Sequence, residues 1–238
     1  MSLRQQIPNI LTALNLIFGV LAIYLLFYGL HKWVLCCMAV SLIADLLDGW
    51  AARKLEVAGP LGVQLDSLAD MLTFGVLPGM MITRMMAGYE NEMLHWIYIT
   101  TGMAVTVGAM MRLAKFNIDE EQKTGFLGLP TPAMSIYIAG LFMPFAFEAP
   151  FLSGIFSGEG WLPFWILQTL MLVFLMNARI PMPSFKDLSS HRPYFFTLTI
   201  MMAAATILCF LFNPAALLLV LSALYICSAV IYSQIIKN

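Results

Sequence analysis

Two pairs of aspartates occur in an otherwise apolar part of the sequence. Asp45 and Asp48 are three residues apart, and Asp66 and Asp70 are four residues apart. At about 3.6 residues per turn, either spacing puts both carboxylates of a pair on one face of a helix. A carboxylate inside a membrane-spanning helix costs free energy and is therefore a candidate functional group. These four aspartates are the residues whose type and spacing most directly predict chemistry.

The chemistry that such a cluster supports is metal-assisted. Four converging carboxylates repel one another unless positive charge lies among them, and only Arg53 and Lys54 are nearby in the sequence. Oxygen ligands at these helical spacings suit Mg²⁺ or Mn²⁺. Two such ions can clamp a phosphate diester or a pyrophosphate and stabilise the leaving oxygen. A metal-ion or proton-coupled transporter also uses buried carboxylates, so the residues alone leave that alternative open.

Small residues accompany both aspartate pairs. Gly49 and Ala52 lie on the arc of the first pair, and Gly62 precedes the second pair by one turn. Small side chains let a bulky ligand approach the helix backbone. A single aspartate near a helix end is more often a cap or a snorkelling group. Two facing pairs with small residues between them favour a ligand site instead.

The composition indicates that these aspartates belong to a membrane protein. Of the 238 residues, 61% are hydrophobic and only 11% are charged, and the mean hydropathy is +0.87. A soluble domain carries roughly 25% charged residues, so this chain could not cover a water-exposed surface. Lys and Arg number 12 against 13 Asp and Glu, which leaves no basic excess for nucleic acid. The four cysteines lie in apolar runs and are interpreted as small buried hydrophobes.

The apolar runs predict an all-α, polytopic membrane helix bundle that forms a single domain over residues 1–238. A spanning helix needs about 20 mostly apolar residues, and open sheets cannot span a bilayer. The Asn213-Pro214 step divides the last long run in two. We expect eight spans near residues 9–29, 33–54, 64–88, 94–116, 130–148, 161–178, 193–212 and 214–236.

The positions of the cations predict the orientation of this bundle. On an eight-span arrangement, Lys32 and Arg84 lie on one side of the membrane. The other side receives Arg4, Arg53, Lys54, Arg112, Lys115, Lys123, Arg179, Lys186, Arg192 and Lys237. Positive charge marks the cytoplasmic face. Both termini are therefore predicted to be cytoplasmic, and the aspartate site is predicted to open near the cytoplasmic boundary.

The segment Asp45–Asp70 reads D-x2-D-G-x2-A-R-x8-G-x3-D-x3-D. This pattern resembles the signature of the CDP-alcohol phosphatidyltransferase family. The resemblance implies a membrane-embedded homodimeric enzyme that binds two divalent cations, Mg²⁺ or Mn²⁺. Such an enzyme transfers a phosphatidyl group from a CDP-linked lipid to an alcohol and releases CMP.

The same resemblance implies roles for individual residues. The metal ligands would be Asp45, Asp48, Asp66 and Asp70, and Asp70 would also be the catalytic base. The nucleotide of the CDP-lipid would contact Gly49, Ala52, Arg53, Gly62 and Asp66. Thr12 and Asn15, which lie about one turn apart on the first span, either face the nucleotide or hydrogen-bond a neighbouring helix.

Further segments resemble the membrane-type phosphatidylserine synthases of that family, in the same order along the chain. They are Ile7-Pro8-Asn9 with Thr12 and Asn15, Leu65–Asp70 followed by Phe74-Gly75-Val76, Arg112–Asn117, Gly128–Ala133 and Pro183–Lys186. They imply CDP-diacylglycerol and L-serine as substrates, phosphatidylserine and CMP as products, and a bacterial-type inner membrane as the location. Glycerol 3-phosphate or an inositol phosphate remains an alternative acceptor.

A serine acceptor would need a cation for its carboxylate. Arg112, Lys115 and Lys186 are the candidate partners of that carboxylate or of a phosphate, with Asn117 as polar support. Arg112 and Lys115 are equally consistent with a positive-inside flank of the fourth span. Lys115 stands where the resemblance leads us to expect Arg, which keeps the charge but loses bidentate geometry.

Overall fold

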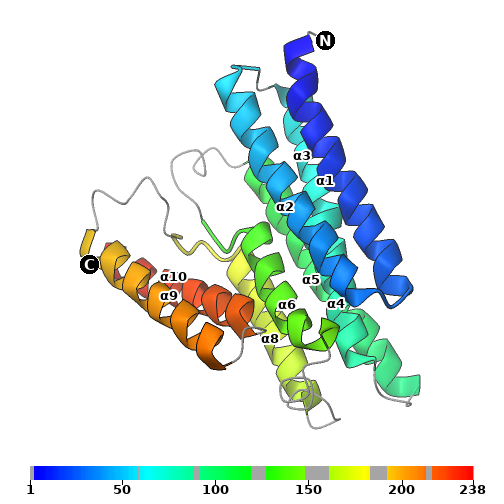
Figure 1. Cartoon of the computed structure of the whole chain (residues 1–238), viewed down its shortest axis with the longest axis vertical. Helices are drawn as coiled ribbons and strands as arrows, with labels where there is room; N and C mark the ends of the chain where they lie inside the picture. The colour runs from blue at the N-terminus through cyan, green and yellow to red at the C-terminus, as the bar shows by residue number, and fades with distance from the viewer. Residues whose placement is uncertain are drawn as a thin grey trace.

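The protein is described by a computed structural model that covers residues 3–57, 59–87, 92–118, 127–147, 161–182, 192–212 and 216–237. Within these residues every regular element is helical, and the one β-type contact is an isolated bridge between Leu127 and Pro181. The helices, shown in Figure 1, are α1 (Leu3–Phe27), α2 (His31–Lys54), α3 (Pro60–Met71), the π-helix η1 (Leu72–Val76), α4 (Leu77–Met86), α5 (Glu92–Ile118), α6 (Thr131–Ala146), α8 (Leu162–Asn177), α9 (Arg192–Phe212) and α10 (Leu217–Lys237). The predicted all-α class is confirmed.

The apolar helices differ in length. Four apolar segments are long enough to cross a membrane: Gln6–Phe27, His31–Lys54, Pro60–Met86 and Leu94–Ile118. α6 and α8 are shorter, with 16 residues each, whereas the apolar segments Phe196–Ile207 and Leu217–Ser233 belong to α9 and α10, which have 21 residues each. A 16-residue helix such as α6 rises about 24 Å, less than the roughly 30 Å hydrocarbon core. The first four predicted spans agree with the structure, whereas the count of eight and the cytoplasmic placement of both termini stay predictions.

α1 begins earlier than the apolar run that predicted it. The helix begins at Leu3 and continues through Pro8, whereas the predicted span begins at residue 9. Hydropathy marks where a helix meets hydrocarbon, but backbone hydrogen bonding can continue into the polar boundary beyond it. The extension matters for the site, because it places one more turn of α1 beside the ends of α2 and α3.

A π-helix interrupts the third span at Leu72, two residues after Asp70. Pro78 has no N–H to donate to the carbonyl of Phe74, four residues earlier. Ser135 Oγ of α6 donates to that carbonyl instead, at 3.0 Å. Thr106 Oγ1 of α5 donates to the neighbouring Gly75 carbonyl at 3.2 Å. The segment predicted as one continuous span is therefore two α-helices joined by a π turn, whose carbonyls are satisfied by neighbouring helices.

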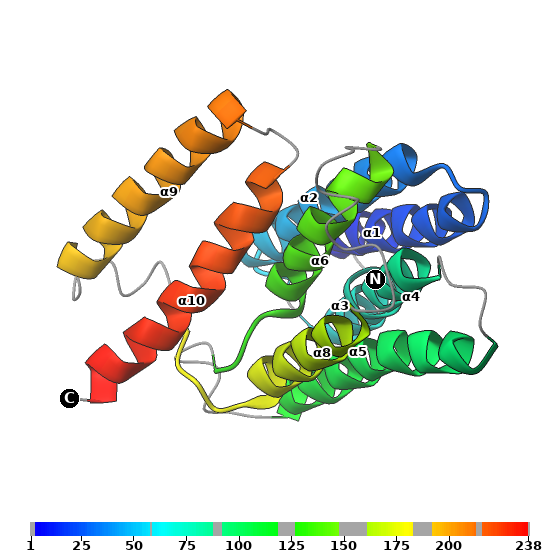
Figure 2. The ribbon, with the colours of Figure 1, turned by 90° about the horizontal axis from the view of Figure 1, so that it is seen from below.

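The helices surround one apolar core. α1 packs along α2 and also against α3, α4 packs on α5 and α6, and α5 packs on α8. Large side chains such as Phe74, Met81, Met134 and Phe142 are fully buried between them. The hairpin of α9 and α10 lies to one side, with α10 packed on α6 and α9 mainly on α10, as Figure 2 shows. The aspartates lie in the α1–α3 part of this bundle.

Candidate active site

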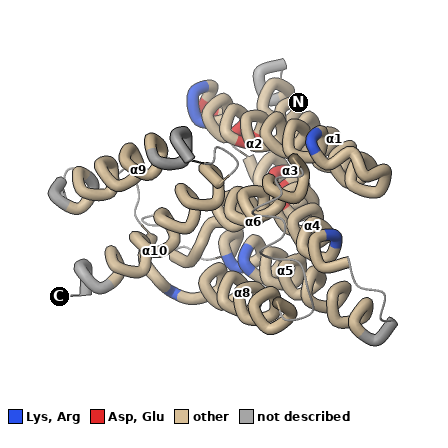
Figure 3. The backbone as a smooth tube through the Cα atoms, turned by 60° about the horizontal axis from the view of Figure 1, so that its bottom comes forward, with Lys and Arg blue, Asp and Glu red and all other residues tan. Residues whose placement is uncertain are grey.

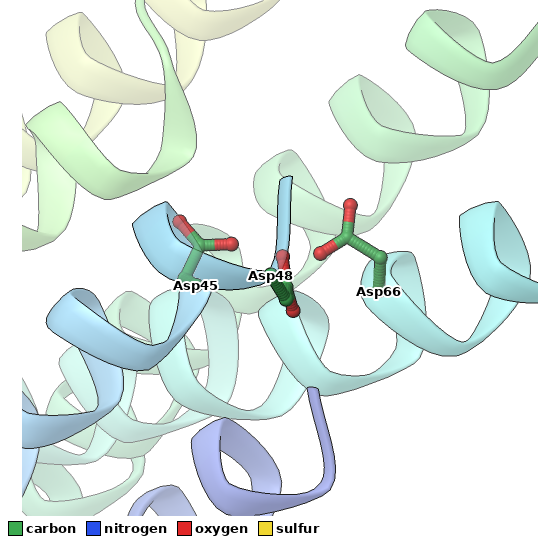
Figure 4. Close-up of side chains that lie close together, drawn as sticks. All are labelled: Asp45, Asp48 and Asp66. Atoms are coloured by element: carbon green, nitrogen blue, oxygen red, sulfur yellow. The ribbon is translucent and has the colours of Figure 1, made fainter. Parts of the chain in front are cut away.

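The structure brings three of the four aspartates together. One carboxylate oxygen from each of Asp45, Asp48 and Asp66 lies within 4.8 Å of the other two. In the view of Figure 4, Asp48 stands between Asp45 and Asp66. The helices that carry them, α2 and α3, both pack against α1. The convergence expected from the helical spacing is therefore present, with α1 as the common neighbour of the two acidic helices.

Asp70 lies one turn after Asp66 and adjoins the cluster through Asp45. The carboxyl groups of Asp70 and Asp45 are within hydrogen-bonding reach of each other. Asn15 Nδ2 donates to Asp70 Oδ1 at 3.1 Å. The Asp70 side chain is only 8% exposed, so these polar neighbours largely determine its orientation. Asp70 thus lies at the buried end of the cluster.

Two polar side chains of α1 hold the aspartates. Thr12 Oγ1 donates to Asp48 Oδ2 at 2.6 Å, and Asn15 reaches Asp70. Asn15 is itself fixed, because its backbone carbonyl accepts from Ser41 Oγ at 2.9 Å and from Thr73 Oγ1 at 3.4 Å. Thr12 and Asn15 therefore both hydrogen-bond aspartates of neighbouring helices, and their contact with the nucleotide stays a prediction.

The cluster fits a divalent cation. Three carboxylates close together supply the hard oxygen donors that Mg²⁺ and Mn²⁺ prefer. Asp66 Oδ1 is buried and has no hydrogen-bond partner among the described residues. A buried carboxylate oxygen without a donor is costly, and a cation between Asp45, Asp48 and Asp66 would remove that cost. Figure 3 shows acidic positions on α2 and α3, with basic positions at the end of α2 and on α5.

A cavity of about 460 Å³ opens beside the cluster. Its lining includes most of the residues predicted to contact the nucleotide: Gly49, Ala52, Arg53, Gly62, Asp66 and Thr12. The other lining residues are Asp48, Pro8, Asn9, Val57, Gly59, Pro60, Leu61 and Val63. Asn15 is not among the lining residues. Asn9 was not predicted as a site residue, although it is a polar residue about one turn before Thr12, at the end of an apolar run. This periodicity is the signal that identifies it.

Gly49 has a specific role in this cavity. A Cβ at position 49 would lie 3.3 Å from Arg53 Nη1, which is closer than an ordinary contact. Without it, the Arg53 guanidinium lies against the helix one turn away, where it interacts electrostatically with Asp48. A cation is therefore held at the rim of the acidic cavity. Phosphate oxygens that approach the aspartates would meet this guanidinium.

A second, basic cavity of about 370 Å³ lies between the ends of α5 and α8. Its lining residues are Arg112, Lys115, Ile118, Leu127, Met176, Asn177, Ala178 and Arg179. Arg112 is only 6% exposed. Its Nε donates to the carbonyl of Leu129, and its Nη2 donates to the carbonyl of Gly128 at 3.2 Å. The guanidinium also lies near enough to Asp70 to interact electrostatically.

The segment that holds Arg112 is itself anchored on α8 and on the residues that follow it. Gly128 N donates to Ile180 O at 2.8 Å, and Leu129 N donates to Leu175 O at 2.9 Å. Gly128 has φ of +75°, a left-handed conformation that favours glycine. A Cβ there would also collide with backbone carbonyls of α8 and of the residue that follows it. The backbone around Gly128 is thereby shaped into a bidentate acceptor for Arg112.

The other predicted acceptor-site residues lie in different places. Lys115 is exposed at the basic cavity, and its Nζ donates to Asn177 Oδ1 at 3.2 Å. Asn117 does not line this cavity; its Nδ2 donates to Ser67 Oγ at 2.8 Å, which ties α5 to α3 beside Asp66. Lys186 and the segment 183–186 lie outside the described residues. Sequence reasoning did not assign Asn177 and Arg179 to a site, because only the meeting of α5 with α8 brings them to Lys115.

The sequence matches the CDP-alcohol phosphatidyltransferase family over residues 5–176, a segment that contains all four aspartates and Arg112. The chain belongs to this family. Within this phosphatidyltransferase, both cavities draw most of their lining from the matched segment, whereas α9 and α10 lie beyond it.

The chain is also similar to curated proteins of known name. The chain is 33% identical over 183 residues to the CDP-diacylglycerol–serine O-phosphatidyltransferase of Bacillus subtilis, covering 76% of this chain and 92% of that protein. It is 28% identical over 233 residues to the Mycobacterium tuberculosis protein of the same name, covering 94% and 76%. It is 30% identical over 140 residues to the archaetidylserine synthase of Methanothermobacter thermautotrophicus, covering 58% of each. These relatives are all named for a serine acceptor or a seryl lipid product.

Proposed function

We propose that this phosphatidyltransferase transfers the phosphatidyl group of CDP-diacylglycerol to L-serine, giving phosphatidylserine and CMP. The observation that carries the proposal is the place of Asp70 between two oppositely charged groups: it lies within hydrogen-bonding reach of Asp45 in the acidic cluster, and it interacts electrostatically with Arg112 of the basic cavity. The acidic cavity suits a cation-bound pyrophosphate, and the basic cavity suits the carboxylate of an amino acid. The names of the Bacillus and Mycobacterium relatives support serine as the acceptor.

The acidic cavity would bind the CDP-lipid. Asp45, Asp48, Asp66 and Asp70 would hold two divalent cations, Mg²⁺ or Mn²⁺, which neutralise charge on the pyrophosphate and on the departing CMP. Arg53, held over Gly49, would contact the phosphates or the cytidine side of the ligand. Gly62 lines this cavity, and a Cβ there would make only an ordinary van der Waals contact, 3.8 Å from Asn9 Oδ1.

The basic cavity would bind the acceptor. Arg112 and Lys115 would contact the serine carboxylate and direct its hydroxyl towards Asp70. Asp70 would take the hydroxyl proton while the serine oxygen forms its bond to the lipid-side phosphorus. The phosphorus–oxygen bond to CMP breaks in the same displacement. Asn15, which donates to Asp70 Oδ1, would keep the carboxylate aimed at this position.

We further propose the setting in which this reaction occurs. The ten cations predicted on one side support a site that faces the cytoplasm, with both chain termini on that side. The bacterial relatives support a bacterial inner membrane. The family resemblance implies a homodimer. Cross-linking of the purified protein in nanodiscs would test the dimer, and protease access in oriented vesicles would test the topology.

Purified protein supplied with CDP-diacylglycerol, Mn²⁺ and one labelled alcohol at a time tests the reaction itself. CMP release with L-serine, and not with glycerol 3-phosphate or an inositol phosphate, supports the proposal. Release with glycerol 3-phosphate instead of serine would exclude serine as the acceptor. Absence of CMP release with every alcohol, together with cation flux in liposomes, would indicate a transporter.

A further inference from the structure

Asn177 occupies a special position in the basic cavity. It is the last residue of α8, and its side-chain Nδ2 donates to two backbone carbonyls at 3.1 Å each. One belongs to Val173 in the preceding turn of α8, and the other belongs to Gly108 of α5. Because both carbonyls are fixed in helices, the amide plane has little freedom to rotate. The direction of the opposite atom, Oδ1, is therefore determined by the fold.

Gly108 makes this arrangement possible. A Cβ at position 108 would lie 3.0 Å from both Cγ atoms of Val173 and 3.1 Å from Met176 Cε. The absent side chain lets α5 and α8 approach closely enough for one amide to bridge them. The contact lies one turn before Arg112 and two turns before Lys115, on the part of α5 that leads into the basic cavity.

The fixed Oδ1 of Asn177 accepts from Lys115 Nζ at 3.2 Å. Lys115 is exposed, and a lysine side chain has many rotamers of similar free energy. Arg112 is positioned differently, because backbone carbonyls hold its guanidinium. A single neutral acceptor orients the ammonium without cancelling its charge, and leaves its other N–H groups for a ligand.

We infer that Asn177 is a positioning residue of the acceptor site: it holds the Lys115 ammonium beside Arg112, where the carboxylate of the incoming amino acid binds. This inference rests on the proposed function for the identity of the acceptor. It assigns Asn177 no contact with the reacting atoms. Its contribution is to affinity for the acceptor, and binding of the CDP-lipid in the other cavity does not depend on it.

A double-mutant cycle with Lys115 tests the inference. Asn177→Ala is expected to raise the KM for serine by about tenfold, as for a lost hydrogen bond to a charged group. The KM for CDP-diacylglycerol is expected to stay unchanged. In a Lys115→Met background the same substitution is expected to leave the serine KM unchanged. Equal effects of Asn177→Ala in both backgrounds, or equal changes in both KM values, would overturn the inference, since a purely structural bridge between α5 and α8 predicts them.

Asn177→Ser tests the same point with a milder change. A serine hydroxyl can donate to the Val173 carbonyl in the preceding turn, but it is too short to hold Lys115 as well. We expect a Tm close to that of wild type and a serine KM raised by about tenfold. A serine KM within about threefold of wild type overturns the inference, and this test stands even where Asn177→Ala does not fold. Thr100→Ala is the matched control, because it removes a side-chain hydrogen bond elsewhere on α5.

The wild-type assay distinguishes failure of this inference from failure of the proposed function. If CMP is released with another alcohol, serine is excluded, and the same cycle measured with that alcohol tests Asn177 by itself. If CMP is released with no alcohol, both proposals are overturned.

Discussion

The acidic and basic cavities hold buried charge in opposite ways. In the acidic cavity, side chains of α1 fasten two of the aspartates, and Asp66 Oδ1 has no partner among the described residues. In the basic cavity, backbone carbonyls around Gly128 satisfy much of the Arg112 guanidinium. The acidic site therefore fits an added cation, whereas the arginine of the basic site is largely satisfied as folded.

Removal of divalent cations is expected to have the largest effect. A chelator should reduce CMP release by about 10³-fold or more, because the aspartates would then repel the substrate pyrophosphate. Mg²⁺ or Mn²⁺ should restore activity, whereas K⁺ at equal ionic strength should not. Binding of labelled serine measured by equilibrium dialysis should change little. Loss of serine binding to the same extent would show that the basic cavity also depends on the cations.

Asp70→Asn is expected to reduce kcat by about 10³-fold, because the base and one ligand oxygen are lost. The protein should remain folded, since an amide can still pair with Asn15 and Asp45. Single-turnover CMP release measures the effect, and size-exclusion chromatography in detergent checks the fold. Activity close to wild type would rule out Asp70 as the base.

Arg112→Ala should act on the other substrate. We expect the serine KM to rise by about 10- to 100-fold, with a smaller change in the KM for CDP-diacylglycerol. Arg112→Lys should recover only part of the loss, because a lysine cannot donate to the Leu129 and Gly128 carbonyls as a planar fork. Equal effects on both substrates would place Arg112 at a phosphate that both cavities share.

Ser135→Ala should have the smallest effect. It leaves the Phe74 carbonyl of the π-helix without its hydroxyl donor, at a cost of about 1 kcal/mol. A small decrease in Tm is expected in detergent, with both KM values unchanged. Thr206→Ala removes a hydroxyl bond within one turn of α9 and serves as the control. A change in kcat for Ser135→Ala much larger than its effect on Tm would show that the π-helix also positions the acidic cavity during turnover.

The local parts of this structure could be predicted, and the contacts between distant segments could not. Apolar runs of about 20 residues predicted α1, α2, α5 and the α3–α4 span, and helical periodicity predicted that the aspartates converge. The bond from Lys115 to Asn177 joins residues 62 positions apart, and the bond from Ser135 to Phe74 joins residues 61 apart. Such pairs depend on which helices become neighbours, and one sequence carries little information about that.

The π turn at Leu72–Val76 separates two requirements that a single rigid helix would have to meet together. The residues before it must face Asp45 and Asp48, while those after it must pack Gly79 closely against Gly102 of α5. One residue added to or removed from a helix rotates everything beyond it by about 100°. The π-helix thus sets how the helical turns that carry Asp66 and Asp70 are rotated relative to the turns that pack on α5. Deletion of one residue there would leave the composition almost unchanged and turn Asp66 and Asp70 away from their partners.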